Sequence, residues 1–183
     1  MPEHLIPARY SDAETSLPEV DRWCSAILAG SRARLLLLGP CMSGKTHTAY
    51  AALRRLLAAG YPPASLGVYR AYEMARDYNP QLIEQAPPVI FLDDLTDRSD
   101  NVAGVKNLEP DEPEIQALMA MHQGAVVDAA ERLAGRAGTS WIACASNRER
   151  LAADLGEDVA VKLLAVADVV ELSPRPQRPV LDW

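Results

Sequence analysis

The sequence contains few of the residues that characterise several common classes of protein. Aromatic residues make up 5% of its 183 positions, and one of them is Phe. Cys24, Cys41 and Cys144 lie far apart without a CxxC pair, which argues against a disulfide framework and a zinc site. No signal peptide follows Met1, and no apolar run is long enough to span a bilayer. We therefore expect a cytoplasmic protein with reduced cysteines and no membrane contact.

The sequence also contains fewer basic than acidic residues. Eighteen Lys and Arg residues are outnumbered by 25 Asp and Glu residues, which gives a net charge of −7. That balance argues against a nucleic-acid-binding protein that acts through bulk basic charge, but it leaves a local basic surface open. The sequence does contain 49% apolar residues, enough to bury a sizeable core in a chain of single-domain length.

Short, wholly apolar runs alternate along the chain with segments of helical spacing. Runs that are apolar at every position suit strands covered on both faces. The pattern therefore predicts an α/β fold, with three layers (α/β/α) around a parallel sheet of about five strands and no separate full-size lid domain. Strands are expected at 35–38, 66–69, 89–92, 141–144 and 169–172, and helices at 18–28, 46–59, 113–133 and 149–167, the last with a break at Gly156.

The remaining segments divide the chain into a domain and two ends. Residues 1–16 are polar and are expected to form an N-terminal arm, 17–173 the domain, and 174–183 an irregular tail with three prolines. Within the domain, we expect a short helix ending near residue 78 and a polar, irregular stretch over 96–112.

The first apolar run ends in a loop that matches the pattern GxxxxGKT. Backbone N–H groups of such a loop, and of the helix that follows it, point at phosphate groups, where the helix dipole favours negative charge. We expect Lys45 to reach the β- and γ-phosphates of ATP and the Thr46 hydroxyl to bind Mg²⁺. The residues expected to contact the nucleotide are Gly39, Pro40, Cys41, Met42, Ser43, Gly44, Lys45, Thr46 and His47.

Two acids follow the apolar run at 89–92. Because this run is expected to be a parallel strand, its carboxyl end should lie beside the phosphate loop. Asp93 would then hold Mg²⁺, together with Thr46, and Asp94 would polarise the water that attacks the γ-phosphate. The alternative is that the two acids only end a strand and face solvent; a preceding phosphate loop favours the first interpretation.

A polar triplet, Ala145-Ser146-Asn147, follows the run at 141–144. The amide of Asn147 could orient the attacking water or touch the γ-phosphate. It could equally be an ordinary helix N-cap, since Asn is among the preferred capping residues. The two roles are compatible, and the sequence leaves both open.

These motifs, in this order, resemble the AAA+ ATPases, and among them the bacterial helicase-loader and insertion-sequence ATP-binding family (DnaC/IstB type). The resemblance spans most of residues 6–178 in short motifs, at 6–10, 38–47, 92–95, 145–147, 162–164 and 169–172. It implies a P-loop ATPase domain that uses ATP and Mg²⁺. It also implies self-assembly or a protein partner such as a helicase or transposase, with single- or double-stranded DNA contacted through the assembly.

Three departures from the family pattern bear on activity. Met42 occupies a loop position where the family usually has Gly, and a positive φ there would cost about 1–3 kcal/mol. Val161 and Lys162 replace an Asp-Arg pair whose Arg, in the family, reaches the γ-phosphate of a neighbouring subunit. Lys162 is thus a candidate catalytic residue acting in trans, or else a solvated charge. The segment ahead of the first strand is shorter than the N-terminal regions of family loaders.

The leading functional hypothesis is a Mg²⁺-dependent ATPase with low intrinsic turnover that loads or remodels a partner, as a replicative helicase loader or a transposition helper. The first alternative is an adaptor or switch that binds ATP and hydrolyses it slowly or not at all. The second is a small-molecule P-loop kinase. The absence of an arginine-rich lid, and an acid pair followed by a sensor-like Asn, favour attack by water over a kinase reaction.

Overall fold

The structure, a computed structural model, describes residues 5–71, 85–96 and 113–174, with 113–122 described by their backbone alone. Three expectations concern segments outside this range: the short helix ending near residue 78, the irregular stretch after Thr96, and the tail beyond residue 174.

All five strands of the described chain form one parallel sheet in the order β2-β3-β4-β1-β5. Their bounds agree with the expected strands to within one residue at each end. The strands are β1 (Arg34–Leu38), β2 (Leu66–Arg70), β3 (Val89–Asp93), β4 (Ser140–Ala145) and β5 (Asp168–Glu171). The α/β prediction is confirmed.

The helices also follow the predicted spacing. The last expected helix is divided in two at Gly156, whose φ of 84° breaks the helical path. The α-helices are α1 (Pro18–Leu28), α2 (Lys45–Ala58), α5 (Pro113–Gly135), α6 (Arg148–Leu155) and α7 (Glu157–Val166), and two 3₁₀ turns are η1 (Ala8–Tyr10) and η2 (Pro63–Ser65).

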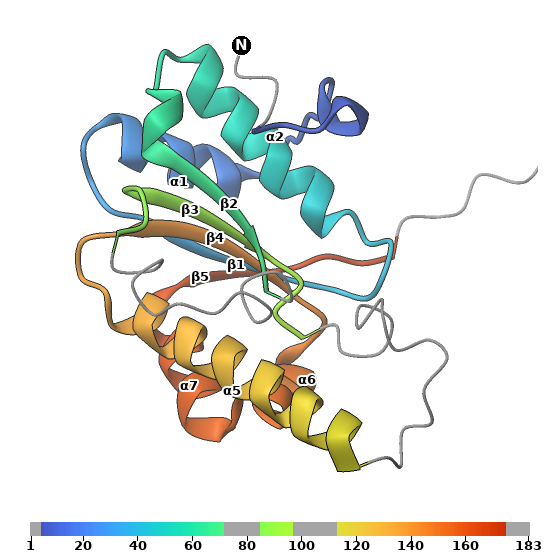
Figure 1. Cartoon of the computed structure of the whole chain (residues 1–183). Coiled ribbons are helices and arrows are strands. Elements are labelled where there is room, and N and C mark those ends of the chain that lie inside the picture. Colours follow the sequence, from blue (N-terminus) through green and yellow to red (C-terminus); the bar gives the residue numbers. More distant parts are fainter. Residues whose placement is uncertain (1–4, 72–84, 97–112, 175–183) are drawn as a thin grey trace, which may run out of the picture.

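Helices cover both faces of the sheet, as Figure 1 shows: α1 and α2 lie on one face, and α5, α6 and α7 on the other. Successive side chains of a strand point to opposite faces, so a wholly apolar strand supplies two cores at once. In β1, Leu35 and Leu37 pack toward α1 and α2, whereas Leu36 and Leu38 pack toward α5–α7. This double burial explains the absence of polar residues from the run.

The N-terminal segment packs on α2 over its described part. Tyr10 stacks on Tyr50 of α2 with ring centroids 4.5 Å apart, and Ala13 is buried in the core of that face. The ring nitrogen Nε2 of His47 lies 3.2 Å from the carbonyl oxygen of Glu14. Because Arg54 and Arg55 of α2 also donate to the carbonyl oxygens of Ala13 and Thr15, this segment contacts both halves of the helix, although the domain boundary at residue 16 stays a prediction. In the described part of the chain, no helix combines the length and apolar character needed to cross a membrane.

Candidate active site

The predicted phosphate loop joins β1 to α2 at the edge of the sheet where the strands end. Parallel α/β sheets bind ligands at this edge. The Gly39 N–H donates to the carbonyl oxygens of Ser146 (2.8 Å) and Ala145 (3.2 Å), which ties the start of the loop to the end of β4. A Cβ atom on Gly39 would lie 2.6 Å from both the Leu172 carbonyl oxygen and Ser43 Oγ. Close packing therefore requires glycine here.

Two residues of the loop have left-handed backbone conformations. Gly44 has φ 93° and is the N-cap of α2, and Met42 has φ 63°. A non-glycine residue in this region carries strain of about 1–3 kcal/mol. The strain energy expected for a positive φ at Met42 therefore applies. Met42 is also 76% exposed.

The polar groups of the loop suit a phosphate. Lys45 Nζ donates to the carbonyl oxygens of Gly39 (2.7 Å) and Pro40 (2.9 Å), so the ammonium group lies against the loop itself. Ser43 is 4% exposed, and its Oγ has no hydrogen-bond partner within the described residues. A buried hydroxyl without a partner is costly, and a phosphate oxygen is an acceptor that would relieve that cost. These residues fit the predicted ligand.

The two residues expected to hold Mg²⁺ are in contact. Thr46, in the first turn of α2, donates from Oγ1 to Oδ1 of Asp93, the last residue of β3, over 3.1 Å. Asp93 is 5% exposed, and this burial raises the pKa of its carboxyl group, while hydrogen bonds from Thr46 and the Cys144 thiol oppose the rise. A hydroxyl beside a carboxylate is a pair of hard oxygen ligands of the kind that Mg²⁺ prefers. The pair fits the ion.

Arg70 is a residue of the site that the sequence reasoning missed. It ends β2 in register with Asp93, and neighbouring residues of parallel strands face the same side of the sheet. Its positive charge counteracts the rise in the pKa of Asp93 that burial causes. For the buried Tyr50, burial and the charge of Asp93 raise the pKa, whereas Arg70 lowers it. Its place directly after a predicted strand indicated that Arg70 lies at this edge of the sheet, but not that it lies beside Asp93.

Asp94 lies just beyond Asp93, half-buried, in the left-handed conformation with φ 58°. The regular pairing of β3 with β4 ends at Leu92, and contact with β4 resumes where the Leu95 N–H donates to the Cys144 carbonyl oxygen over 2.9 Å. Asp94 is thus the strained point of a short irregularity between two fixed contacts. Strain of this kind concentrates at functional sites.

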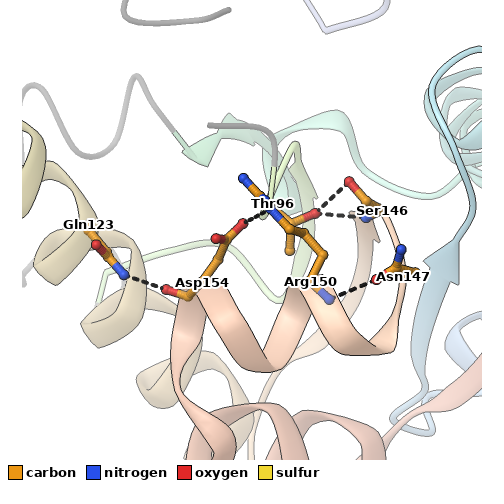
Figure 2. Close-up of polar contacts among 6 residues, drawn as sticks. All are labelled: Thr96, Gln123, Ser146, Asn147, Arg150 and Asp154. Atoms are coloured by element: carbon orange, nitrogen blue, oxygen red, sulfur yellow. Dashed lines mark hydrogen bonds and ion pairs between the residues drawn. The ribbon is translucent and has the colours of Figure 1, made fainter. Parts of the chain in front are cut away.

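Asn147 is the N-cap of α6. Its Oδ1 accepts a hydrogen bond of 2.7 Å from the Arg150 N–H, as Figure 2 shows, so the capping interpretation is confirmed. Further along α6, Arg150 Nε donates to Asp154 Oδ2 over 2.9 Å, and Gln123 of α5 donates to the Asp154 carbonyl oxygen over 2.9 Å. The start of α6 is therefore well anchored. A catalytic role for the exposed Asn147 stays a prediction.

Lys162 lies on α7, away from the loop of its own chain. Its neighbours Ala160 and Leu163 are buried, and its Nζ forms an ion pair of 2.6 Å with Glu131 Oε1 of α5. Because α7 ends immediately before β5 begins, the second half of this helix lies toward the edge of the sheet opposite to the phosphate loop. Lys162 is not brought to its own site, so a catalytic role would require a second chain.

The fold is similar to that of several solved proteins, although the sequence is not. No protein-family model matches the sequence, and no curated protein is detectably similar to it in sequence. The structure, however, superposes on the DnaC helicase loader with a TM-score of 0.59 at 15% identity, covering 91% of this chain and 99% of that one. On DnaI the TM-score is 0.60 at 15% identity, with 97% and 94% covered.

A third similar structure is a replication initiator, DnaA, bound to AMPPCP and single-stranded DNA. Its TM-score is 0.52 at 13% identity, with 85% of this chain and 44% of that one covered. These likenesses show the fold, a parallel sheet covered by helices on both faces with the predicted phosphate loop after β1. The chain therefore has the fold that the DnaC helicase loader and DnaI share, as the resemblance of its motifs predicted.

Proposed function

We propose that this chain binds ATP and Mg²⁺ at the loop 39–46 and hydrolyses the nucleotide in order to load or remodel a protein–DNA partner, in the manner of a helicase loader. The observation that best supports this function is the 3.1 Å contact between Thr46 Oγ1 and Asp93 Oδ1 beside the phosphate loop. Thr46 and Asp93 are 47 residues apart in sequence, and the fold brings together the two oxygen groups that a Mg-nucleotide needs.

The residues of the site divide the work of hydrolysis. Lys45 would exchange the carbonyl oxygens it now contacts for oxygens of the β- and γ-phosphates. Thr46 and Asp93 would hold Mg²⁺, which supplies positive charge to the phosphate oxygens when it is bound. Asp94 would accept a hydrogen bond from the attacking water and orient it. All four side chains come from the loop, from the start of α2 and from the end of β3.

Turnover in the isolated chain should be slow. Hydrolysis spreads negative charge over the γ-phosphate, and a basic residue from outside commonly adds about 10³–10⁵ in rate. Lys162 is our candidate for this residue, because it is 53% exposed and lies on the α5–α7 face, where a neighbouring chain could reach it. We infer that self-assembly, or a partner such as a helicase or transposase with its DNA, completes the site.

A calorimetric titration with Mg-ATP tests the binding step. We expect the Lys45→Ala variant to lose affinity by at least about 100-fold, because the lysine supplies the positive charge nearest the phosphates. Lys162→Ala is the matched control, and it should bind Mg-ATP like the parent. Equal affinity of the Lys45→Ala variant and the parent would refute the site.

The ion pair of Lys162 with Glu131 favours a second candidate function, a slow ATP-binding switch. In this alternative Lys162 has only a structural partner, and nucleotide binding rather than hydrolysis alters the affinity for the partner. Phosphate release measured over a range of protein concentrations separates the two functions. Turnover per chain that rises with concentration supports the assembled ATPase, and negligible turnover at every concentration, with DNA and helicase present, supports the switch.

A further inference from the structure

Thr96, two residues after Asp94, is a buried polar residue. Its side chain is 3% exposed, and its hydroxyl makes two hydrogen bonds to one residue at the end of β4, as Figure 2 shows. Thr96 Oγ1 donates to Ser146 Oγ over 2.9 Å and accepts from the Ser146 N–H over 2.7 Å. Two bonds to the same residue fix the hydroxyl in both position and orientation.

Ser146 extends this contact to the phosphate loop. Its carbonyl oxygen accepts the 2.8 Å hydrogen bond from the Gly39 N–H at the start of the loop. Thr96, Ser146 and Gly39 therefore form a continuous hydrogen-bonded link across three segments that are distant in sequence. The link joins the turn after β3, the end of β4 and the loop after β1.

The turn that Thr96 closes contains Asp94. A left-handed conformation at a non-glycine residue persists only where the surrounding contacts determine it. On one side of Asp94 the strand β3 is paired with β4, and on the other the Leu95 N–H donates to the Cys144 carbonyl oxygen over 2.9 Å. Thr96 adds the next two hydrogen bonds along the chain. Removing its hydroxyl would therefore loosen the turn on the side that follows Asp94.

We propose that Thr96 is a positioning residue, which holds the strained turn of Asp94 against the end of β4 and thereby fixes the Asp94 carboxylate relative to the phosphate loop. This inference rests on the proposed ATPase function, in which Asp94 orients the attacking water. It assigns the rate of the chemical step, rather than nucleotide affinity, to the Thr96–Ser146 contact. Thr96 itself touches neither nucleotide nor water in this scheme.

The test compares Thr96→Val with Thr96→Ser. Valine keeps the shape of the side chain but loses both hydrogen bonds, whereas serine keeps the hydroxyl. Under conditions where each variant is folded, we expect Thr96→Val to lower kcat by about 10- to 100-fold, since small misplacements of catalytic groups cost rates of this order. Its dissociation constant for Mg-ATP should stay within about threefold of the parent, and Thr96→Ser should restore most of kcat.

If Thr96 only stabilised the fold, Thr96→Val would lower the melting temperature but would not lower kcat while leaving the dissociation constant for Mg-ATP unchanged. Two further measurements sharpen the distinction. Adding Thr96→Val to Asp94→Asn should cause no further loss of kcat, because the positioned group is already gone. Ser146→Ala removes one of the two bonds but keeps the N–H, so it should lower kcat less than Thr96→Val, and it serves if the valine variant does not fold. Full kcat in Thr96→Val or in Ser146→Ala would overturn the proposal. It would also be overturned if the double variant lost kcat by the product of the two single-variant losses.

Failure of the proposed function gives a different result. If the parent chain binds Mg-ATP but shows no turnover with any partner, the ATPase function fails whatever the variants do. Amide hydrogen exchange then tests the link directly. We expect Thr96→Val to speed exchange at Leu95 and Gly39 while leaving the amides of β1 protected. Unchanged exchange at both positions would overturn the positioning role.

Discussion

The two faces of the sheet differ in what they contribute to the candidate reaction. On the α2 face, Lys45 contacts the loop after β1, and Thr46 at the start of α2 contacts the buried Asp93 at the end of β3. On the α5–α7 face, Lys162 is half-exposed and paired with Glu131 of α5. Under the proposed function, one chain contains the groups for binding Mg-ATP, whereas its candidate basic finger lies on the other face of the sheet. The difference separates binding, which a single chain should perform, from fast hydrolysis, which should need a second molecule.

The largest expected effect is at Asp94, a change that should separate hydrolysis from binding within one chain. Asp94→Asn should bind Mg-ATP with an affinity close to that of the parent and lose about 10²–10⁴ in turnover, the usual contribution of a group that accepts a proton from the attacking water. Phosphate release and a binding titration measure the two quantities. Asp168→Asn, an exposed acid at the start of β5, is the matched control and should retain both. Turnover unchanged in Asp94→Asn would remove Asp94 from the mechanism.

The second prediction tests whether the α5–α7 face acts across a subunit boundary. Lys162→Ala should lower turnover by at least about tenfold, less than the ~10³–10⁵ of an arginine finger, because lysine is a point charge rather than a bidentate clamp. Mixing Lys162→Ala protein with Lys45→Ala protein should recover activity. In the mixed assembly, a Lys45→Ala chain supplies its Lys162 to the intact loop of its neighbour.

Lys162→Arg provides the comparison for this experiment and should turn over at least as fast as the parent. Two results would contradict action in trans. One is full activity in Lys162→Ala alone, and the other is turnover per chain that does not change on dilution.

The third prediction concerns the cost of burying Asp93. Burial raises the pKa of this carboxyl group above its value in the unfolded chain. Its contribution to stability is therefore fully present below the unfolded pKa of about 3.9, and it is lost as the pH rises through the higher folded pKa. At pH 7 Asp93→Asn should raise the melting temperature of the nucleotide-free protein by about 2–4 °C for each kcal/mol relieved.

Thermal unfolding between pH 4 and pH 8 measures this effect, and the advantage of Asp93→Asn should shrink as the pH falls toward about 4. Saturating Mg-ATP should reverse the order, because the parent gains more stability from the ligand. Asp168→Asn, a change at an exposed acid, again serves as the control. A parent that is more stable than Asp93→Asn at pH 7 without nucleotide would show that the hydrogen bonds to Asp93 outweigh its burial.

The smallest effect is expected from breaking the ion pair between Lys162 and Glu131. Both side chains are about half-exposed, at 53% and 50%, and surface pairs of this kind contribute little to folding. Glu131→Gln should shift the melting temperature by less than about 2 °C. It should leave turnover equal or higher, because it releases Lys162 for a neighbouring chain. A large loss of stability would instead assign Lys162 a structural role on this face.

Secondary structure was predictable wherever consecutive residues show by their polarity which of them are buried. The run 35–38 is apolar at every position because both cores need it, and Gly39 follows because no Cβ fits against Leu172 and Ser43. The order of strand, loop and helix then predicts the phosphate loop without reference to the rest of the fold. The same reasoning located Asp93 and Asp94, since each follows directly from the end of a buried strand.

Contacts between segments distant in sequence were not predictable in this way. The residues around Arg70 do not indicate that β2 lies beside β3. Only the strand order brings the charge of Arg70 next to Asp93. The hydrogen bonds between Thr96 and Ser146 depend on the irregular turn at Asp94. The sequence left the capping and catalytic roles of Asn147 open, and the start of α6 showed the cap.

By itself the sequence determined the α/β class, the phosphate loop and the identity of the acids at the end of β3. These depend on local patterns of burial and on motif residues that are adjacent along the chain. The tertiary structure decided that Thr46 touches Asp93, that Thr96 is linked to the loop through Ser146, and that Lys162 pairs with Glu131. The physical reason is that strand order and helix packing set distances between residues far apart in sequence, and no local pattern encodes those distances.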